Sequence, residues 1–318
     1  MRSFSKLKKV VSIFLFIPVL VTNIAFSSSP VHQRMFKVSE NLEISYREAG
    51  DPTHPTVLLL HGFPTSSHMF RNLIPALATD FHVLAPDYPG YGNSSQPARE
   101  DFTYSFANFA DLMEKFIDYK KVNKFAVYLM DYGAPVGFRL FAKNPSRVSA
   151  FIIQNGNAYD EGLLDFWDPI KKYWNENTTE NRNALRGLLT LGATKWQYTH
   201  GTEDVTRVSS DNWFHDQYLL DREGNNEIQL DMFYDYRTNV ALYPKWQKLF
   251  RSFAPPTLIV WGKNDVIFPE AGAHPYKKDI KDLETHILNT GHFALEEKLD
   301  EMVPLIRSFL FRKLSYLR

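Results

Sequence analysis

The sequence predicts an α/β fold with a mostly parallel central sheet, helices on both faces of the sheet and an inserted helical cap. Short apolar segments typical of buried strands recur along the chain, and segments with helical spacing lie between them. One long middle stretch lacks strand-like segments. Alternation of this kind favours a parallel sheet. The chain has 318 residues, of which 44% are hydrophobic, enough for one large globular domain with an insertion.

The expected elements follow one another in the order that strand–helix–strand units require. Residues 42–48 alternate between polar and apolar side chains, as in a half-exposed strand, and residues 104–121 carry apolar side chains at helical spacing. The other expected strands are 56–60, 81–86, 125–130, 148–153, 257–261 and 284–288, and the other expected helices are 71–77 and 301–317.

The pattern changes between residues 157 and 253, which are rich in aromatic and polar side chains and contain no strongly apolar strand. Helical segments are expected at 167–175 and 181–191. We therefore predict a helical cap domain at 157–253, inserted into a core formed by 30–156 and 254–318.

The first residues are typical of a secretory signal. Four basic side chains precede an apolar stretch at 10–26, and serines then lead to Pro30. This order predicts a signal peptide at 1–29 and export of the mature chain, either to a periplasm or out of the cell. The alternative is an uncleaved membrane anchor, since the apolar stretch is near the shortest length that spans a bilayer.

Composition and spacing exclude several classes of function. The formal net charge is zero, which gives no indication of a nucleic-acid partner. The chain has no cysteine, which excludes disulfides, thiol chemistry and cysteine–zinc sites. No histidine spacing suggests a metal site, and no glycine-rich phosphate loop is present. We expect no metal and no cofactor, and the sequence does not indicate an oligomeric state.

Asp131 is the residue that narrows the chemistry most. It follows the apolar segment 125–130 and comes just before Gly133 and a helix-compatible stretch. A sharp turn from strand to helix presents a nucleophile at the carboxyl edge of a sheet. A serine there would indicate an esterase or a peptidase. An aspartate favours attack on a saturated carbon, which gives an ester on the enzyme itself.

Three motifs in this order resemble those of the α/β-hydrolases. They are His61-Gly-Phe-Pro64, the turn around Asp131, and Gly262-Lys-Asn-Asp265 followed by Gly291-His-Phe293. The resemblance covers essentially the whole mature length and implies the α/β-hydrolase fold.

The resemblance also implies a catalytic triad in the chain order nucleophile, acid, base. Asp131 is the nucleophile, Asp265 orients His292, and His292 activates water. The backbone amides of Phe63 and Tyr132 are expected to form an oxyanion hole. In some relatives the acid follows the strand corresponding to 148–153, but here that position reads Gln-Asn-Gly-Asn and holds no carboxylate.

The two reactions that fit an aspartate nucleophile differ in how the leaving group is stabilised. Haloalkane dehalogenases commonly hold the halide with a tryptophan after the nucleophile and an asparagine in the His-Gly motif. This chain has Tyr132 and Phe63 at those positions, although Leu129 resembles the dehalogenase pattern. A cap tryptophan is another possible donor, and the candidates are Trp167, Trp174 and Trp196.

Epoxide hydrolases protonate the epoxide oxygen with two cap tyrosines. The candidates favoured here are Tyr198 together with Tyr234 or Tyr236. We therefore predict an epoxide hydrolase-like enzyme that acts on a small apolar organic substrate and water. The alternatives are a haloalkane or haloacid dehalogenase-like hydrolase and a non-catalytic binding protein on a hydrolase frame.

Overall fold

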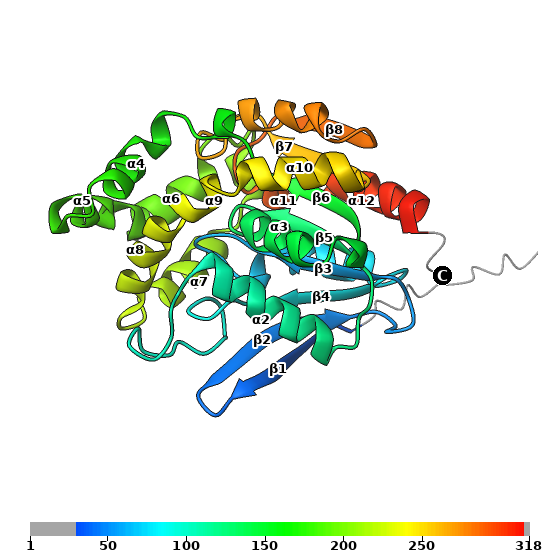
Figure 1. Cartoon of the computed structure of the whole chain (residues 1–318), viewed down its shortest axis with the longest axis horizontal. Helices are drawn as coiled ribbons and strands as arrows, with labels where there is room; N and C mark the ends of the chain where they lie inside the picture. Colours follow the sequence, from blue (N-terminus) through cyan, green and yellow to red (C-terminus); the bar gives the residue numbers. More distant parts are fainter. Residues whose placement is uncertain (1–29, 315–318) are drawn as a thin grey trace, which may run out of the picture.

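The apolar segments of the sequence form one eight-stranded sheet in the computed structural model, which describes residues 30–314 (Figure 1). The strand order is β1-β2-β4-β3-β5-β6-β7-β8. The pairs β1–β2 and β2–β4 are antiparallel, and all other neighbours are parallel. The predicted fold class is confirmed. The predicted signal peptide lies outside the described residues.

The central strands are wholly apolar or nearly so because helices cover both of their faces. In β3, Leu58 and Leu60 belong to one hydrophobic cluster and Val57 and Leu59 to the other. The strands are β1 (His32–Ser39), β2 (Leu42–Ala49), β3 (Thr56–Leu60), β4 (His82–Pro86), β5 (Phe125–Met130), β6 (Val148–Gln154), β7 (Thr257–Gly262) and β8 (Leu283–Leu288).

Strand β1 is an element that the sequence did not predict. It pairs with β2 at the edge of the sheet, and among its side chains only Phe36 is buried. An exposed edge strand of this kind lacks the alternation that marks a half-buried strand, so it left no pattern to recognise.

Two layers of helices enclose the sheet. Side chains of α2 (Phe106–Tyr119), α3 (Gly133–Lys143) and α10 (Tyr243–Phe253) belong to one hydrophobic cluster. Side chains of α1 (Leu73–Leu77) and α12 (Leu299–Leu314) belong to the other. The two clusters take alternate residues of the central strands, so they lie on opposite faces of the sheet.

The chain between β6 and β7 is helical, with no strand in this described stretch. Most of these helices lie together at one end of the sheet (Figure 1). The last of them, α10, packs against the sheet layer, since Phe250 contacts Phe138 and Phe151. The helices before it are α4 (Asp168–Asn175), α5 (Thr179–Ala184), α6 (Leu191–Thr199), α7 (Ser210–Leu220), α8 (Asn225–Asp235) and α9 (Arg237–Val240).

Short elements complete the described chain. Helix α11 (Ala294–Glu297) directly precedes α12. The 3₁₀ turns are η1 (Ser67–Phe70), η2 (Pro145–Arg147), η3 (Asp160–Gly162), η4 (Asp165–Trp167), η5 (Leu185–Leu189), η6 (Val205–Arg207), η7 (Glu270–Gly272) and η8 (His274–Lys278).

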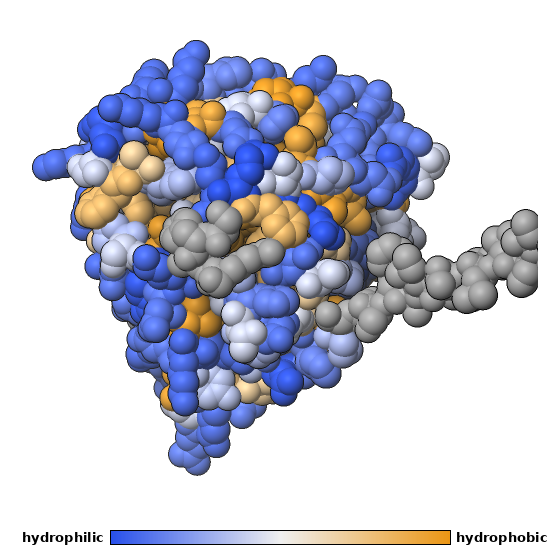
Figure 2. Space-filling view, turned by 90° about the vertical axis from the view of Figure 1, so that its right-hand side faces the viewer, coloured by the Kyte–Doolittle hydropathy of each residue, from blue (hydrophilic) through white to orange (hydrophobic). Residues whose placement is uncertain are grey.

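Hydrophilic residues predominate on the face of the molecule shown in Figure 2, with apolar residues in smaller groups between them. In residues 30–314, no helix combines the length and the apolar character needed to cross a bilayer.

Candidate active site

Asp131 occupies a strained turn between β5 and α3. Its φ angle is +52°, in the left-handed region that few residues other than glycine adopt. The next turn of chain passes very close to β3, because a Cβ added to Gly133 would lie 2.1 Å from the carbonyl oxygen of Leu60. Glycine is therefore required at 133, and the turn holds the Asp131 side chain at the carboxyl edge of the sheet.

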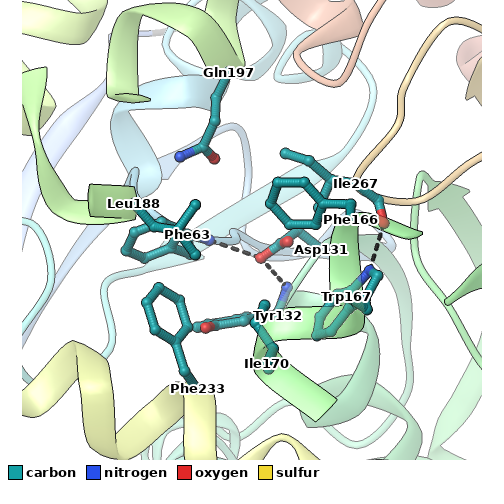
Figure 3. Close-up of a pocket in the computed structure, with 10 residues that line it drawn as sticks. All are labelled: Phe63, Asp131, Tyr132, Phe166, Trp167, Ile170, Leu188, Gln197, Phe233 and Ile267. Carbon is teal, nitrogen blue, oxygen red and sulfur yellow. Dashed lines mark hydrogen bonds between the residues drawn. The ribbon is translucent and has the colours of Figure 1, made fainter. Parts of the chain in front are cut away.

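The loop after β3 brings a second backbone segment against Asp131. A Cβ on Gly62 would lie 2.5 Å from Asp131 Oδ1, so only glycine allows this approach. The amide of Phe63 donates a hydrogen bond to Oδ1 over 2.8 Å, and the amide of Tyr132 donates to the same oxygen over 2.5 Å (Figure 3). The predicted oxyanion-hole amides thus converge on one oxygen of the carboxylate.

Burial raises the pKa of Asp131 to about 6. The nearby His292 and the amides of Phe63 and Tyr132 favour the charged form and oppose this effect. Residue Asp131 is only 4% exposed, so the ionised form of its carboxylate depends on these few contacts.

His292 lies between the two aspartates. Its Nδ1 is 2.7 Å from Asp265 Oδ2, and its Nε2 is 3.8 Å from Asp131 Oδ2. Within the described residues, Nε2 has no hydrogen-bond partner. Burial lowers the pKa of His292, but the charge and hydrogen bond of Asp265 and the charge of Asp131 outweigh burial and raise it overall.

Asn155 is a residue of this site that the sequence did not single out. It follows β6 with a φ of +41°, and its Nδ2 donates to Asp265 Oδ2 over 2.9 Å. Its Oδ1 accepts from the amide of Gly262 over 2.9 Å. Asp265 Oδ1 also accepts from the amide of Ile267 over 2.8 Å, so Asp265 is held at both oxygens. Asn155 occupies the strand end that carries the acid in some relatives.

A pocket opens above Asp131, between the sheet edge and the helices that follow β6 (Figure 3). Its walls are mostly aromatic and aliphatic, as in many sites for small organic molecules. The lining residues are Phe63, Asp131, Tyr132, Phe166, Trp167, Ile170, Leu188, Gln197, Phe233 and Ile267.

Tyr198, Tyr234 and Tyr236, proposed from the sequence as leaving-group donors, do not line this pocket. The Tyr198 hydroxyl donates to Asp216 Oδ2 over 2.5 Å, and its ring stacks on Phe293. This side chain is therefore engaged in packing between the cap and the loop that carries His292.

The other two proposed tyrosines, Tyr234 and Tyr236, lie outside the pocket lining and pack against neighbouring side chains. The ring of Tyr234 lies 3.6 Å from the guanidinium of Arg237. Tyr236 is buried and its ring packs 4.5 Å from that of Trp167, but its hydroxyl has no hydrogen-bond partner among the described residues.

Two of the three candidate cap tryptophans have their indole N–H groups in use, and only Trp167 lines the pocket. Trp167 Nε1 donates to the carbonyl oxygen of Ile267 over 2.6 Å, and Trp174 Nε1 donates to that of Phe233 over 2.7 Å. The ring of Trp196 stacks on that of Phe166. Neither Trp167 nor Trp174 offers a free donor to a leaving group.

Two polar side chains remain in the pocket besides Asp131. They are the phenol of Tyr132 and the amide of Gln197 (Figure 3). Gln197 was not predicted, although it directly precedes Tyr198, which was. Successive helical residues point about 100° apart, so an error of one residue changes which side chain enters a site.

Residues 30–314 contain no group of three or more histidine, aspartate, glutamate or cysteine side chains placed to hold a metal ion.

Comparisons with known proteins identify the same fold. The family model described as alpha/beta hydrolase fold matches residues 55–299. An uncharacterized hydrolase of Saccharomyces cerevisiae is 44% identical over 264 residues, which cover 82% of this chain and 90% of the yeast protein. A haloalkane dehalogenase of Mesorhizobium japonicum is 41% identical over 105 residues, about 33% of each chain.

Solved structures with the same fold include two kinds of hydrolase. A haloalkane dehalogenase from Bradyrhizobium elkani has a TM-score of 0.68 at 21% identity, covering 88% of this chain and 99% of that one. An epoxide hydrolase solved without ligand has a TM-score of 0.70 at 20% identity, covering 91% of this chain and 100% of that one.

Proposed function

The chain belongs to the α/β-hydrolase fold family and is a hydrolase, and from this premise we propose that Asp131 is its nucleophile. In this proposal Asp131 Oδ2 attacks a saturated carbon and forms an alkyl-enzyme ester, and a water activated by His292 then hydrolyses the ester. A carboxylate that attacked an ester carbonyl would form a high-energy anhydride instead, so a leaving group on a saturated carbon fits this nucleophile better.

The proposal rests on one observation: the two carboxylate oxygens of Asp131 have different neighbours. Oδ1 accepts two backbone amides, whereas Oδ2 faces His292. When Oδ2 attacks carbon, Oδ1 becomes the carbonyl oxygen of the ester. It then already lies in the pair of amides that would stabilise the negative charge formed when water adds to the ester.

The second half-reaction uses the Asp265–His292 pair. His292 Nε2 takes a proton from water as the water oxygen attacks the Asp131 carboxyl carbon. Asp265, bound to Nδ1, stabilises the imidazolium that forms. Collapse of the adduct breaks the bond between the ester carbon and Oδ2, releases the alcohol and restores the Asp131 carboxylate.

We favour epoxides as substrates because the pocket contains a phenol. Opening an epoxide leaves an alkoxide, which requires a proton, and the Tyr132 hydroxyl is a proton donor that lines the pocket. The tryptophan indole that lines the same pocket, that of Trp167, is bound to a carbonyl oxygen and is not free for a halide.

Carbon–halogen hydrolysis is the second candidate. It is favoured by the relatives named haloalkane dehalogenase, which are 41% and 37% identical over 105-residue segments. A halide leaves without a proton, so the same nucleophile would serve.

Export of the mature chain through the signal peptide at 1–29 is a further proposal.

Trapping the ester tests the mechanism. His292→Gln blocks the activation of water but not the attack, so this variant should accumulate an adduct on the peptide that contains Asp131. We would incubate it with 1,2-epoxybutane and with 1-bromobutane, which have the same carbon skeleton, and follow the peptide by mass spectrometry. The class that labels faster identifies the leaving group.

Two control variants change the proposed nucleophile, Asp131, and the phenol of Tyr132. Adding Asp131→Asn to His292→Gln should abolish labelling. Adding Tyr132→Phe, which keeps the backbone amide, should slow labelling by the epoxide about 100-fold and labelling by the bromide far less. Absence of any adduct, together with turnover of simple esters by Asp131→Ala, would overturn the proposed function.

A further inference from the structure

Gln197 differs from the other buried glutamines of the described chain, which are Gln154, Gln217 and Gln229. Each of those three donates through its nitrogen and accepts through its oxygen. Gln197 lines the pocket and forms no hydrogen bond with another described residue.

Gln217 on helix α7 is a close match for comparison. Both side chains belong to cap helices, and each residue is 6% exposed. Gln217 Oε1 accepts from Thr194 over 2.7 Å, and its Nε2 donates to the Leu189 carbonyl over 3.0 Å and to Asp221 over 2.7 Å. The two glutamines are equally buried, but only Gln217 forms hydrogen bonds with its neighbours. Gln217 therefore stabilises the cap, whereas Gln197 does not.

The unbonded amide of Gln197 points into the pocket. Figure 3 shows its side chain leaving helix α6 and ending in the space in front of Asp131. The surrounding walls are apolar, among them Phe63, Phe166 and Leu188. Since the Gln197 amide forms no hydrogen bond within the protein, an apolar side chain here should not destabilise the empty protein.

We propose that Gln197 is a substrate-binding residue whose Nε2 donates a hydrogen bond to the epoxide oxygen. This inference rests on the proposed function. As Asp131 Oδ2 forms its bond to carbon, the carbon–oxygen bond of the epoxide breaks and its electron pair goes to the oxygen. Gln197 holds that oxygen by a hydrogen bond and gives up no proton, because an amide is far too weak an acid.

The proton comes from the Tyr132 hydroxyl. The resulting phenolate recovers it from the imidazolium of His292 after water has added to the ester, directly or through solvent. The whole cycle therefore adds one water to one epoxide. Two donors, one that only binds and one that transfers a proton, would replace the pair of cap tyrosines expected from the sequence.

The test compares Gln197→Leu with Gln217→Leu, each added to His292→Gln. We would measure the rate of adduct formation with 1,2-epoxybutane in a single turnover, and the Tm. Gln197→Leu should slow labelling about 10- to 100-fold, as for loss of one preorganised donor, with an unchanged or higher Tm. Gln217→Leu should leave the labelling rate unchanged and lower the Tm by about 4 °C or more.

Each outcome decides the inference. Labelling of Gln197→Leu at the parent rate, or a fall in its Tm like that of Gln217→Leu, would show that Gln197 is structural. A loss confined to 1-bromobutane would overturn the assignment to the epoxide oxygen. If the His292→Gln parent gives no adduct with either probe, the nucleophile itself is wrong, and the inference is overturned together with the proposed function.

Discussion

At the scale of single residues, two opposed effects act on Asp131. The proposed nucleophile must be ionised to attack, but burial disfavours its charge and raises its pKa to about 6. The amides of Phe63 and Tyr132 and the charge of His292 offset part of that effect. The result is a carboxylate that is ionised near neutral pH and that water solvates poorly, which favours attack on carbon.

The pKa of Asp131 predicts the acid side of the pH profile. Only the ionised form attacks, so kcat/KM for 1,2-epoxybutane should fall about tenfold per pH unit below about 6. A series of initial-rate measurements at low substrate concentration checks this. A profile that stays flat down to about pH 4 would show that another group attacks.

Asp131 should also lower the stability of the protein at neutral pH. Its pKa is higher in the folded protein, about 6, than the ordinary value of 3.8. The folded state is therefore favoured by this group below pH 3.8, and that contribution is lost as the pH rises through about 6.

Asp131→Asn keeps an oxygen for the two amides and removes the charge. Its free energy of unfolding should exceed that of the natural protein by up to about 3 kcal/mol above pH 6, with little difference near pH 4. Urea unfolding at several pH values measures this. A variant less stable than the natural protein at neutral pH would contradict the prediction.

At the scale of elements, the residues of the candidate site come from the ends of neighbouring parallel strands. Asp131 follows β5, Asn155 follows β6, and Asp265 follows β7 by a few residues. Because parallel strands end at the same edge, residues far apart in sequence meet there. The contact between Asn155 and Asp265 arises in this way.

Because Asn155 lies beside Asp265, we expect a carboxylate at position 155 to compensate in part for the loss of the one at position 265. Asp265→Asn removes the charge that stabilises the His292 imidazolium and should slow ester hydrolysis about 100-fold or more. Adding Asn155→Asp places a carboxylate beside the same ring and should restore part of that loss. Build-up and decay of the ester, followed by rapid-quench mass spectrometry, measure the step directly. No recovery, with the fold intact by circular dichroism, would contradict the prediction.

The residues at strand ends were predictable from sequence, whereas the cap side chains that line the pocket were not. Asp131, Asp265 and His292 each follow an apolar strand or a Gly-containing turn, which are local signals, and the structure brings all three together. Two of the three buried side chains of α6, Thr194 and Gln197, are polar. Polar residues on the inward face hide the periodicity that would have identified that face.

At the scale of the whole molecule, the cap and the sheet share one hydrophobic cluster. Phe106 and Leu60 of the sheet layer and Trp167 and Phe233 of the cap all belong to it. Polar contacts add to this connection: Glu296 of α11 accepts from Arg71 over 2.7 Å and from Asn212 of the cap over 2.7 Å.

A shared core predicts cooperative unfolding. Because the cap helices bury their apolar side chains against the sheet layer, the cap should not remain folded when the core unfolds. Scanning calorimetry should show one transition, and tryptophan fluorescence should change at the same temperature as circular dichroism. Two separated transitions would indicate that the cap is an independent folding unit.

The position of His292 between two carboxylates has a consequence for the order of events. Its pKa is raised partly by the charge of Asp131, and that charge disappears once Asp131 is esterified. In the proposed reaction the pKa of His292 should therefore fall after the first half-reaction, which favours the neutral base needed for hydrolysis. Esterification of the proposed nucleophile would thus favour the basic form of His292 at the step that uses it, without any movement of the ring.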